Sequence, residues 1–67
     1  MRLDQLTPCD RFILRLYNGY EDEPVETRTG VFKCVYSSNP DFCVVVFDGI
    51  EGEQYEHSHY DVEKIEG

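Results

Sequence analysis

The sequence lacks the features of an exported or membrane-spanning protein. No apolar run approaches the ~20 residues that a transmembrane helix needs, and the opening residues, MRLD, form neither the charged region nor the apolar stretch of a signal peptide. The three cysteines are an odd number without a Cys-x-x-Cys pair, unlike the disulfide framework of a small secreted domain. We therefore expect a soluble cytoplasmic protein with reduced thiols. Two of them should pack as small hydrophobic side chains; the alternative is an incidental disulfide between Cys34 and Cys43 across a strand pair.

Basic residues are almost missing from the second half of the chain. Residues 34–67 contain eight acids and Lys64 as the single base, so this half carries −7 of the net charge of −8. Such a field repels phosphate backbones and anionic membranes over about a Debye length, ~8 Å at physiological salt. We expect no direct nucleic-acid or membrane binding, and a protein partner with a basic surface. The simpler interpretation is that the acidity only maintains solubility.

The length allows one small domain, residues 1–67, with little room for a catalytic pocket. A chain of 67 residues buries only about 60% of the surface that its unfolded form exposes. A reactive thiol would need a basic group in a cleft, whereas acidic surroundings raise thiol pKa values. We therefore expect a protein that is not an enzyme, with no catalytic residue and no cofactor.

The hydrophobic pattern predicts an all-β domain of four to five short antiparallel strands. Turn residues recur every eight to twelve positions between short apolar segments rich in aromatic and β-branched residues, which favours a small barrel. In segment 11–17, Phe12, Leu14 and Leu16 should share one buried face. Gly30 should break the chain or form a bulge. The expected strands are 11–17, 25–28, 31–36, 42–47 and 54–58, and Val62 with Ile65 fits either a helical turn or a last strand.

Several short motifs together resemble those of a known family. In order along the chain they are Leu3-x-x-Leu6, Asp10-Arg11-Phe12, Thr29-Gly30-Val31-Phe32, Val44-Val45-Val46-Phe47-Asp48-Gly49 and Ser58-x-x-Asp61-Val62-Glu63-Lys64-Ile65. This order resembles the small SH3-like (Tudor-like) barrels of short prokaryotic and phage proteins. The resemblance implies a small barrel that binds through loops and one open face, and implies no catalytic residue. The chain departs from the pattern at Cys9, where the family's corner has glycine, and in its longer, acidic first loop.

Two acidic loops with neighbouring tyrosines are the candidate partner-binding site. Loops at one rim of a small barrel can adjoin, which would gather their carboxylates beside aromatic anchors of the kind enriched at interfaces. The structural alternative is two ordinary solvated loops whose tyrosine rings pack on the core. The candidate residues are Tyr20, Glu21, Asp22, Glu23, Glu51, Glu53, Tyr55 and Glu56, with Glu26 and Tyr60 adjoining them.

These features favour a non-enzymatic protein-binding module, encoded by a phage or mobile element. One alternative is an inhibitor that mimics nucleic acid, with carboxylates that occupy the basic groove of a nuclease, a polymerase or a CRISPR-type complex. A second is a metal- or thiol-dependent site, because His57 and His59 on a strand would share one face and could bind zinc with Cys34, Cys43 or Asp61. No metal is expected at this isolated pair. An edge strand at 54–58 could also pair with a second copy as a homodimer.

Overall fold

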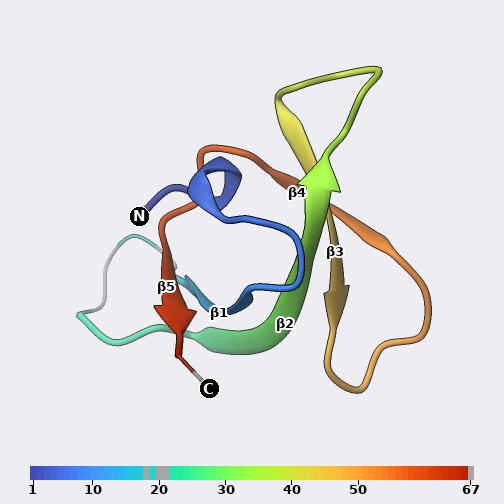
Figure 1. The fold of residues 1–67 in the computed structure, drawn as a ribbon. Helices are drawn as coiled ribbons and strands as arrows, with labels where there is room; N and C mark the ends of the chain where they lie inside the picture. Colours follow the sequence, from blue (N-terminus) through green and yellow to red (C-terminus); the bar gives the residue numbers. More distant parts are fainter. Residues whose placement is uncertain (18, 20–21, 67) are drawn as a thin grey trace.

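The computed structural model describes residues 1–17, 19 and 22–66, and it contains five strands and one short helix. The elements are the 3₁₀ helix η1 (Leu3–Gln5) and the strands β1 (Arg11–Leu16), β2 (Glu26–Val35), β3 (Phe42–Phe47), β4 (Gln54–His57) and β5 (Val62–Ile65). The strands form one antiparallel sheet in the order β4-β3-β2-β1-β5 (Figure 1). The all-β fold class is confirmed, and Val62 and Ile65 lie on a strand.

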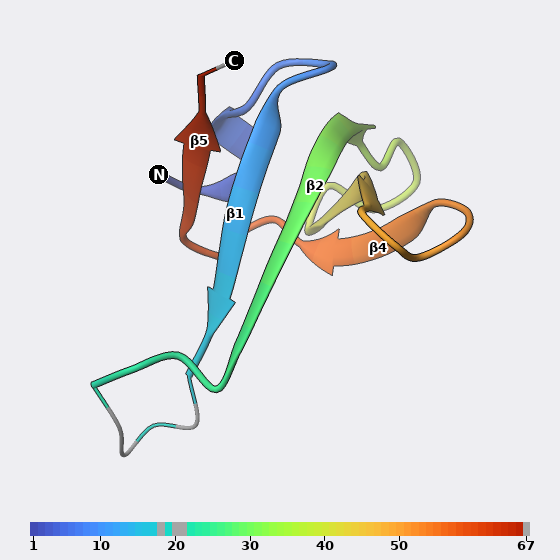
Figure 2. The same cartoon turned by 90° about the horizontal axis from the view of Figure 1, so that it is seen from below.

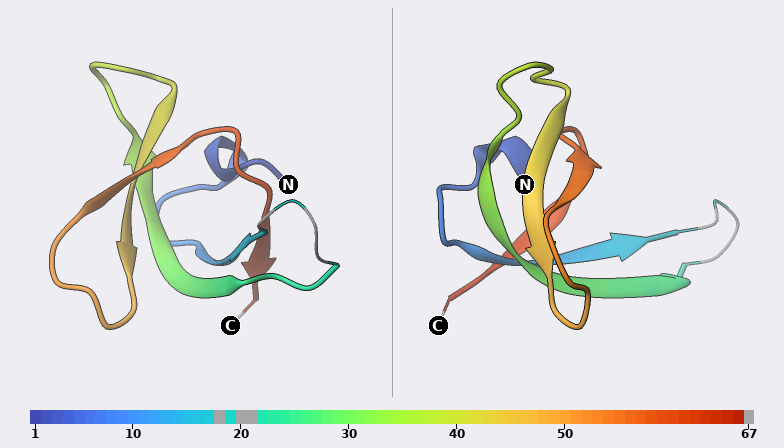
Figure 3. Two further views of the ribbon diagram at one scale, coloured as in Figure 1. Left: turned by 180° about the vertical axis from the view of Figure 1, so that it is seen from behind. Right: turned by 90° about the vertical axis from the view of Figure 1, so that its right-hand side faces the viewer.

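The long strand β2 bends and so belongs to both halves of the sheet. Its first part pairs with β1, with Leu16 opposite Glu26 and Arg11 opposite Val31. Its second part pairs with β3, from Gly30 opposite Phe47 onwards. Figure 3 shows β2 as a long curved strand, and β1 and β3 pair with its two parts. The sheet therefore coils around its buried side chains and forms a small open barrel.

Two separate strands were expected around Gly30, and this expectation is wrong. The strand continues through Gly30, and the register shift lies between Phe32 and Cys34. Glycine is needed here for close packing, because a Cβ atom would lie 2.7 Å from the Val46 carbonyl oxygen and 3.0 Å from Phe47 Cδ1. The missing side chain lets β2 bend against β3 without breaking the ladder.

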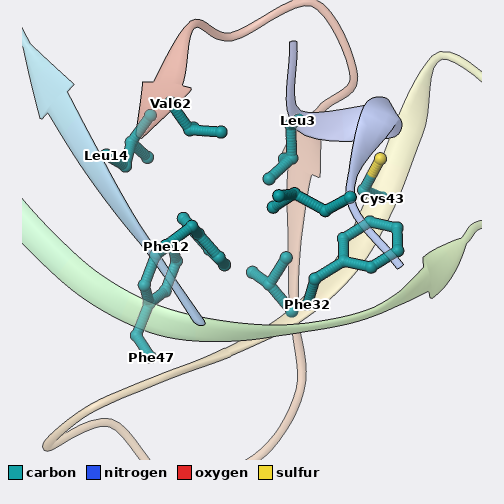
Figure 4. Packing of buried hydrophobic residues seen from close by; sticks show 9 residues of the cluster. Leu3, Phe12, Leu14, Phe32, Cys43, Phe47 and Val62 are labelled. Carbon is teal, nitrogen blue, oxygen red and sulfur yellow. The ribbon is translucent and has the colours of Figure 1, made fainter. Parts of the chain in front are cut away.

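Alternate residues of the strands fill the core. The cluster consists of Leu3, Leu6, Phe12, Leu14, Phe32, Cys43, Val45, Phe47 and Val62, with Leu16 partly buried against it. Figure 4 shows these side chains converging from strands on opposite sides of the barrel. The rings of Phe12 and Phe47 meet edge to face with centroids 5.9 Å apart, a favoured aromatic geometry. The predicted buried face of β1 is confirmed.

A tight corner leads into β1. The Asp10 carboxylate accepts hydrogen bonds from the Thr7 N–H (2.9 Å) and the Thr7 hydroxyl (2.8 Å). These bonds, backbone first, and nearby Lys64 lower the pKa of Asp10. Cys9 has a φ of 75°, a left-handed conformation that favours glycine. Cys9 therefore holds a turn conformation in which a side chain is disfavoured.

Segments far apart in the sequence close one end of the barrel. The Leu3 N–H donates to the Tyr60 carbonyl at 2.9 Å and the Asp4 N–H to the Ser58 carbonyl at 3.3 Å. Figure 2 shows η1 beside β5. Within the described residues β4 pairs only with β3, so it has one unpaired edge. The outer edge of β5 is partly covered by the N-terminal segment, because the Val62 N–H donates to the Met1 carbonyl at 2.7 Å and Arg2 bridges to Asp61.

Candidate functional site

The outward face of β4 exposes aromatic rings beside the neighbouring strand. Tyr55 and His57 point to the same side, as predicted, with Tyr55 opposite Val44 and His57 opposite Phe42 on β3. Tyr55 is 56% exposed and Phe42 37% exposed. The Phe42 and His57 rings are in edge contact at 5.8 Å, and Tyr55 lies against Tyr36 at 5.1 Å. Exposed aromatic rings on a strand face provide contact area at little entropic cost.

The hairpin formed by β3 and β4 carries carboxylates without basic counterparts. Residues 41–58 contain five acids and no lysine or arginine. Asp48 is paired with Arg11 at 2.7 Å. Within the described part of the chain, no Lys or Arg lies within ion-pair distance of the other four, Asp41, Glu51, Glu53 and Glu56. The hairpin that carries the exposed rings therefore has four carboxylates without an ion pair in the described part of the chain.

Most basic side chains are already engaged elsewhere on the molecule. Five of the six lie within ion-pair distance of a carboxylate, in the pairs Arg2–Asp4, Arg11–Asp48, Arg15–Glu63, Arg28–Glu26 and Lys64–Asp10. These pairs are exposed, so each contributes at most about 1 kcal/mol to stability. Two of the pairs, Arg15–Glu63 and Lys64–Asp10, neutralise charge on the β1–β5 side. The β3–β4 hairpin, by contrast, keeps four carboxylates without an ion pair among the described residues.

Glu56 points to the inner face of the sheet, because it lies opposite the buried Cys43. It is half-buried, whereas its neighbours on β4, Tyr55 and His57, are exposed. Burial is the main reason that the pKa of Glu56 is raised; nearby Arg28 opposes this and Glu26 adds to it. Arg28 donates to Glu26 at 3.0 Å and lies over the Phe47 ring, 5.5 Å from its centroid. Glu56 thus interacts with the charges of Arg28 and Glu26 and does not lie on the exposed face.

The two predicted acidic loops do not adjoin. The segment 22–25 lies beyond the ends of β1 and β2, and the β3–β4 connection projects from another side of the barrel in all the views of Figures 1 to 3. The expectation of a single acidic rim is wrong, because the bend of β2 turns the two hairpins in different directions. Glu51, Glu53, Tyr55 and Glu56 remain together on one hairpin. Asp22 and Glu23 lie apart from them, and Tyr20 and Glu21 lie outside the described residues.

The His57 and His59 rings are in tilted contact, and among the described residues they are not part of a ligand cluster. Their ring centroids are 4.8 Å apart, and the His59 N–H donates to His57 Nδ1 at 3.2 Å. The Tyr60 and His57 rings meet edge to face, with centroids 6.1 Å apart. Across residues 1–17, 19 and 22–66, no three His, Cys, Asp or Glu side chains are grouped to hold a metal ion.

The cysteines are free, and their burial differs from the expectation of two packed thiols. Only Cys43 is buried, whereas Cys9 and Cys34 are exposed. Cys34 lies opposite Val44, not Cys43, so the register does not place the pair for a disulfide. Burial raises the pKa of the Cys43 thiol, which contacts Ser58 Oγ at 3.3 Å. Cys43 is therefore a core side chain.

A shallow groove beside β1 and β5 was not anticipated from the sequence. It is lined chiefly by Arg15, Tyr17, Tyr60 and Glu63, and the Arg15–Glu63 ion pair at 2.7 Å spans it. Its charges neutralise each other. The sequence analysis also did not include Phe42 and His57 in the candidate site. Side chains alternate between the two faces of a strand, so His57 could have been placed on the same face as Tyr55, with Phe42 opposite it on β3.

Comparisons with known proteins give no independent identification. No protein-family model, curated protein or solved structure matches the chain. The resemblance to SH3-like barrels therefore stays a prediction. In the described part of the chain, no helix has the length and apolar character needed to cross a membrane.

Proposed function

We propose that this protein is a small non-enzymatic binding module that docks on a basic protein surface through the outer face of β4. We call this face the β4 surface and define it as Phe42, Glu51, Glu53, Tyr55 and His57. One observation carries the proposal: uncompensated carboxylates flank exposed aromatic rings on the same hairpin. Aromatic anchors supply contact area, and complementary charge supplies fast association and selection of the partner.

The distribution of ion pairs supports this location over the rest of the surface. On the opposite side, Arg15 and Glu63 neutralise each other at 2.7 Å, so a basic partner gains less there. The nucleic-acid mimic gains no comparable support, because its acidic loops point in different directions. A metal-dependent role gains none either, because His57 and His59 lack further ligands among the described residues.

Two charge-reversal variants with identical net charge test the proposal. E51K/E53K alters the β4 surface, and D22K/E23K alters the β1–β2 loop; each changes the net charge from −8 to −4. The wild type and both variants are used to capture proteins from host lysate at low and high salt, followed by mass spectrometry. We expect at least a tenfold loss of a reproducible partner with E51K/E53K and full retention with D22K/E23K. Equal loss with both variants would mean that net charge alone governs capture, and the proposal would be wrong.

A further inference from the structure

The unpaired edge of β4 has a defined hydrogen-bonding pattern. The Ser58 N–H donates to the Asp41 carbonyl at 2.8 Å, and Phe42 lies opposite His57. In an antiparallel ladder, alternate residues direct their backbone groups toward the same neighbour. Gln54, Glu56 and Ser58 therefore face β3, while Tyr55 and His57 direct their N–H and C=O groups away from it.

Tyr55 is the residue whose backbone groups lie open at this edge. The His57 carbonyl already accepts from the Tyr60 N–H at 3.2 Å. Outside the ladder, no described residue bonds to the N–H or C=O of Tyr55. Strands with open edges are templates for pairing with another chain, and natural sheets protect them with charged side chains, above all lysine, with proline, with bulges or by keeping them short. Residues 53–58, EQYEHS, contain neither lysine nor proline.

We propose that the β4 edge binds an extended basic segment of a partner protein as an added antiparallel strand. This inference rests on the proposed function and names the form of the partner. Main-chain hydrogen bonds to Tyr55 would provide the pairing, and alternating basic side chains would meet the carboxylates of Glu53 and Glu51. The exposed Tyr55 ring would cover apolar side chains on the same face of the added strand.

Charge selects a basic segment over a second copy of this chain. Two β4 strands placed edge to edge would bring together two hairpins that each carry five acids and no lysine or arginine over residues 41–58, and repulsion between charges of one sign opposes such pairing. The outer edge of β5 is less open to β4 of a second copy, because the Val62 N–H already donates to the Met1 carbonyl at 2.7 Å and Arg2 bridges to Asp61. The carboxylates therefore prevent self-pairing and at the same time complement a basic strand.

The probe is a capped synthetic heptapeptide in which lysine alternates with valine and threonine. Its comparison peptide has the same sequence and charge but carries N-methyl groups on its internal peptide nitrogens, which cannot donate to a strand. Binding to the full chain is measured by titration calorimetry at low and moderate salt. We expect the N-methylated peptide to bind at least tenfold more weakly. Equal affinities would overturn strand addition, and so would failure of the parent peptide to saturate.

Two substitutions at one residue separate backbone from side-chain contributions. Tyr55→Pro removes an N–H that faces outward, at an edge position where proline is compatible with a sheet. Tyr55→Ala removes the ring and keeps the N–H. We expect Tyr55→Pro to bind the parent peptide at least tenfold more weakly than Tyr55→Ala, with both folded by circular dichroism. Equal affinities would overturn the proposal, and if Tyr55→Pro fails to fold, the N-methylated peptide decides.

Hydrogen exchange locates the contact on the wild-type chain. The peptide should slow exchange of the Tyr55 amide at least tenfold and change the Glu56 amide, which faces β3, much less. Protection of Tyr55 that rises with protein concentration in the absence of peptide would identify a second copy as the occupant and overturn the proposal. If the parent and N-methylated peptides bind equally well, only the proposal of strand addition is contradicted. The proposed binding function is tested separately by the two charge-matched variants E51K/E53K and D22K/E23K.

Discussion

Replacing Gly30 by alanine tests whether close packing at the bend of β2 determines the residue. In a strand interior, alanine is favoured over glycine by roughly 0.5–1 kcal/mol through backbone entropy. The structure opposes this gain, because the new Cβ would lie 2.7 Å from the Val46 carbonyl oxygen and 3.2 Å from Phe47 Cα. Both are backbone atoms held in the β2–β3 ladder, so they cannot move aside as a side chain would. Overpacking of this kind costs about 1–3 kcal/mol.

We therefore expect Gly30→Ala to lower the free energy of unfolding by up to about 2.5 kcal/mol, the balance of the two effects. A domain of this size has a total stability of roughly 3–10 kcal/mol, so the loss is readily measured. Urea unfolding followed by circular dichroism gives the midpoint and slope, and an unchanged slope assigns the effect to the folded state. Lys33→Ala, at an exposed position of the same strand, should stay within about 0.5 kcal/mol. A Gly30→Ala variant more stable than wild type would refute the argument.

Three further predictions concern buried groups. In the native protein a thiol reagent should modify two cysteines rapidly, while Cys43 reacts only as the fold opens, because its thiol is buried and has a raised pKa; three rapid thiols would contradict the packing. Ser58→Ala should cost about 1–3 kcal/mol in urea unfolding, because the Pro40 carbonyl loses its 2.8 Å hydrogen bond from the Ser58 hydroxyl. Glu56 has a raised pKa in the folded state, so its contribution to stability is present below its unfolded pKa of about 4.5 and is lost as pH rises through the folded pKa. Glu56→Gln should therefore gain stability relative to wild type between pH 4 and pH 7, and a pH-independent difference would contradict the burial of this carboxyl.

Much of the fold was predictable because its strands have strong local signals. The apolar run from Phe42 to Phe47 coincides with β3, and the alternation of Phe12 and Leu14 identified the buried face of β1. The prediction for Gly30 was wrong, because a glycine considered only with its sequence neighbours indicates a strand break or a bulge. Its actual role depends on Val46 and Phe47, which become its neighbours only in the folded sheet.

The candidate site was predictable only within one hairpin. Glu53, Tyr55 and Glu56 are neighbours in sequence, so their proximity needs no knowledge of topology. The supposed juxtaposition with Asp22 and Glu23 depended on how far β2 bends, and no residue pattern reports that angle. The ion pairs that leave the hairpin carboxylates uncompensated also join distant segments, such as Arg15 with Glu63, and are invisible before folding.

The closing arrangement of the barrel has a consequence for how the chain acquires its fold during synthesis. β1 is made early, yet one of its two partners is β5, and Leu3 bonds to Tyr60. The core therefore cannot be completed until residues 58–65 have left the ribosome, several seconds after β1 at typical rates of about 5–20 residues per second. During that interval the early strands expose apolar surface that Val62 will later cover. A chain truncated before β5 would leave this apolar surface uncovered and should be cleaved by proteases far more readily than the chain that includes β5.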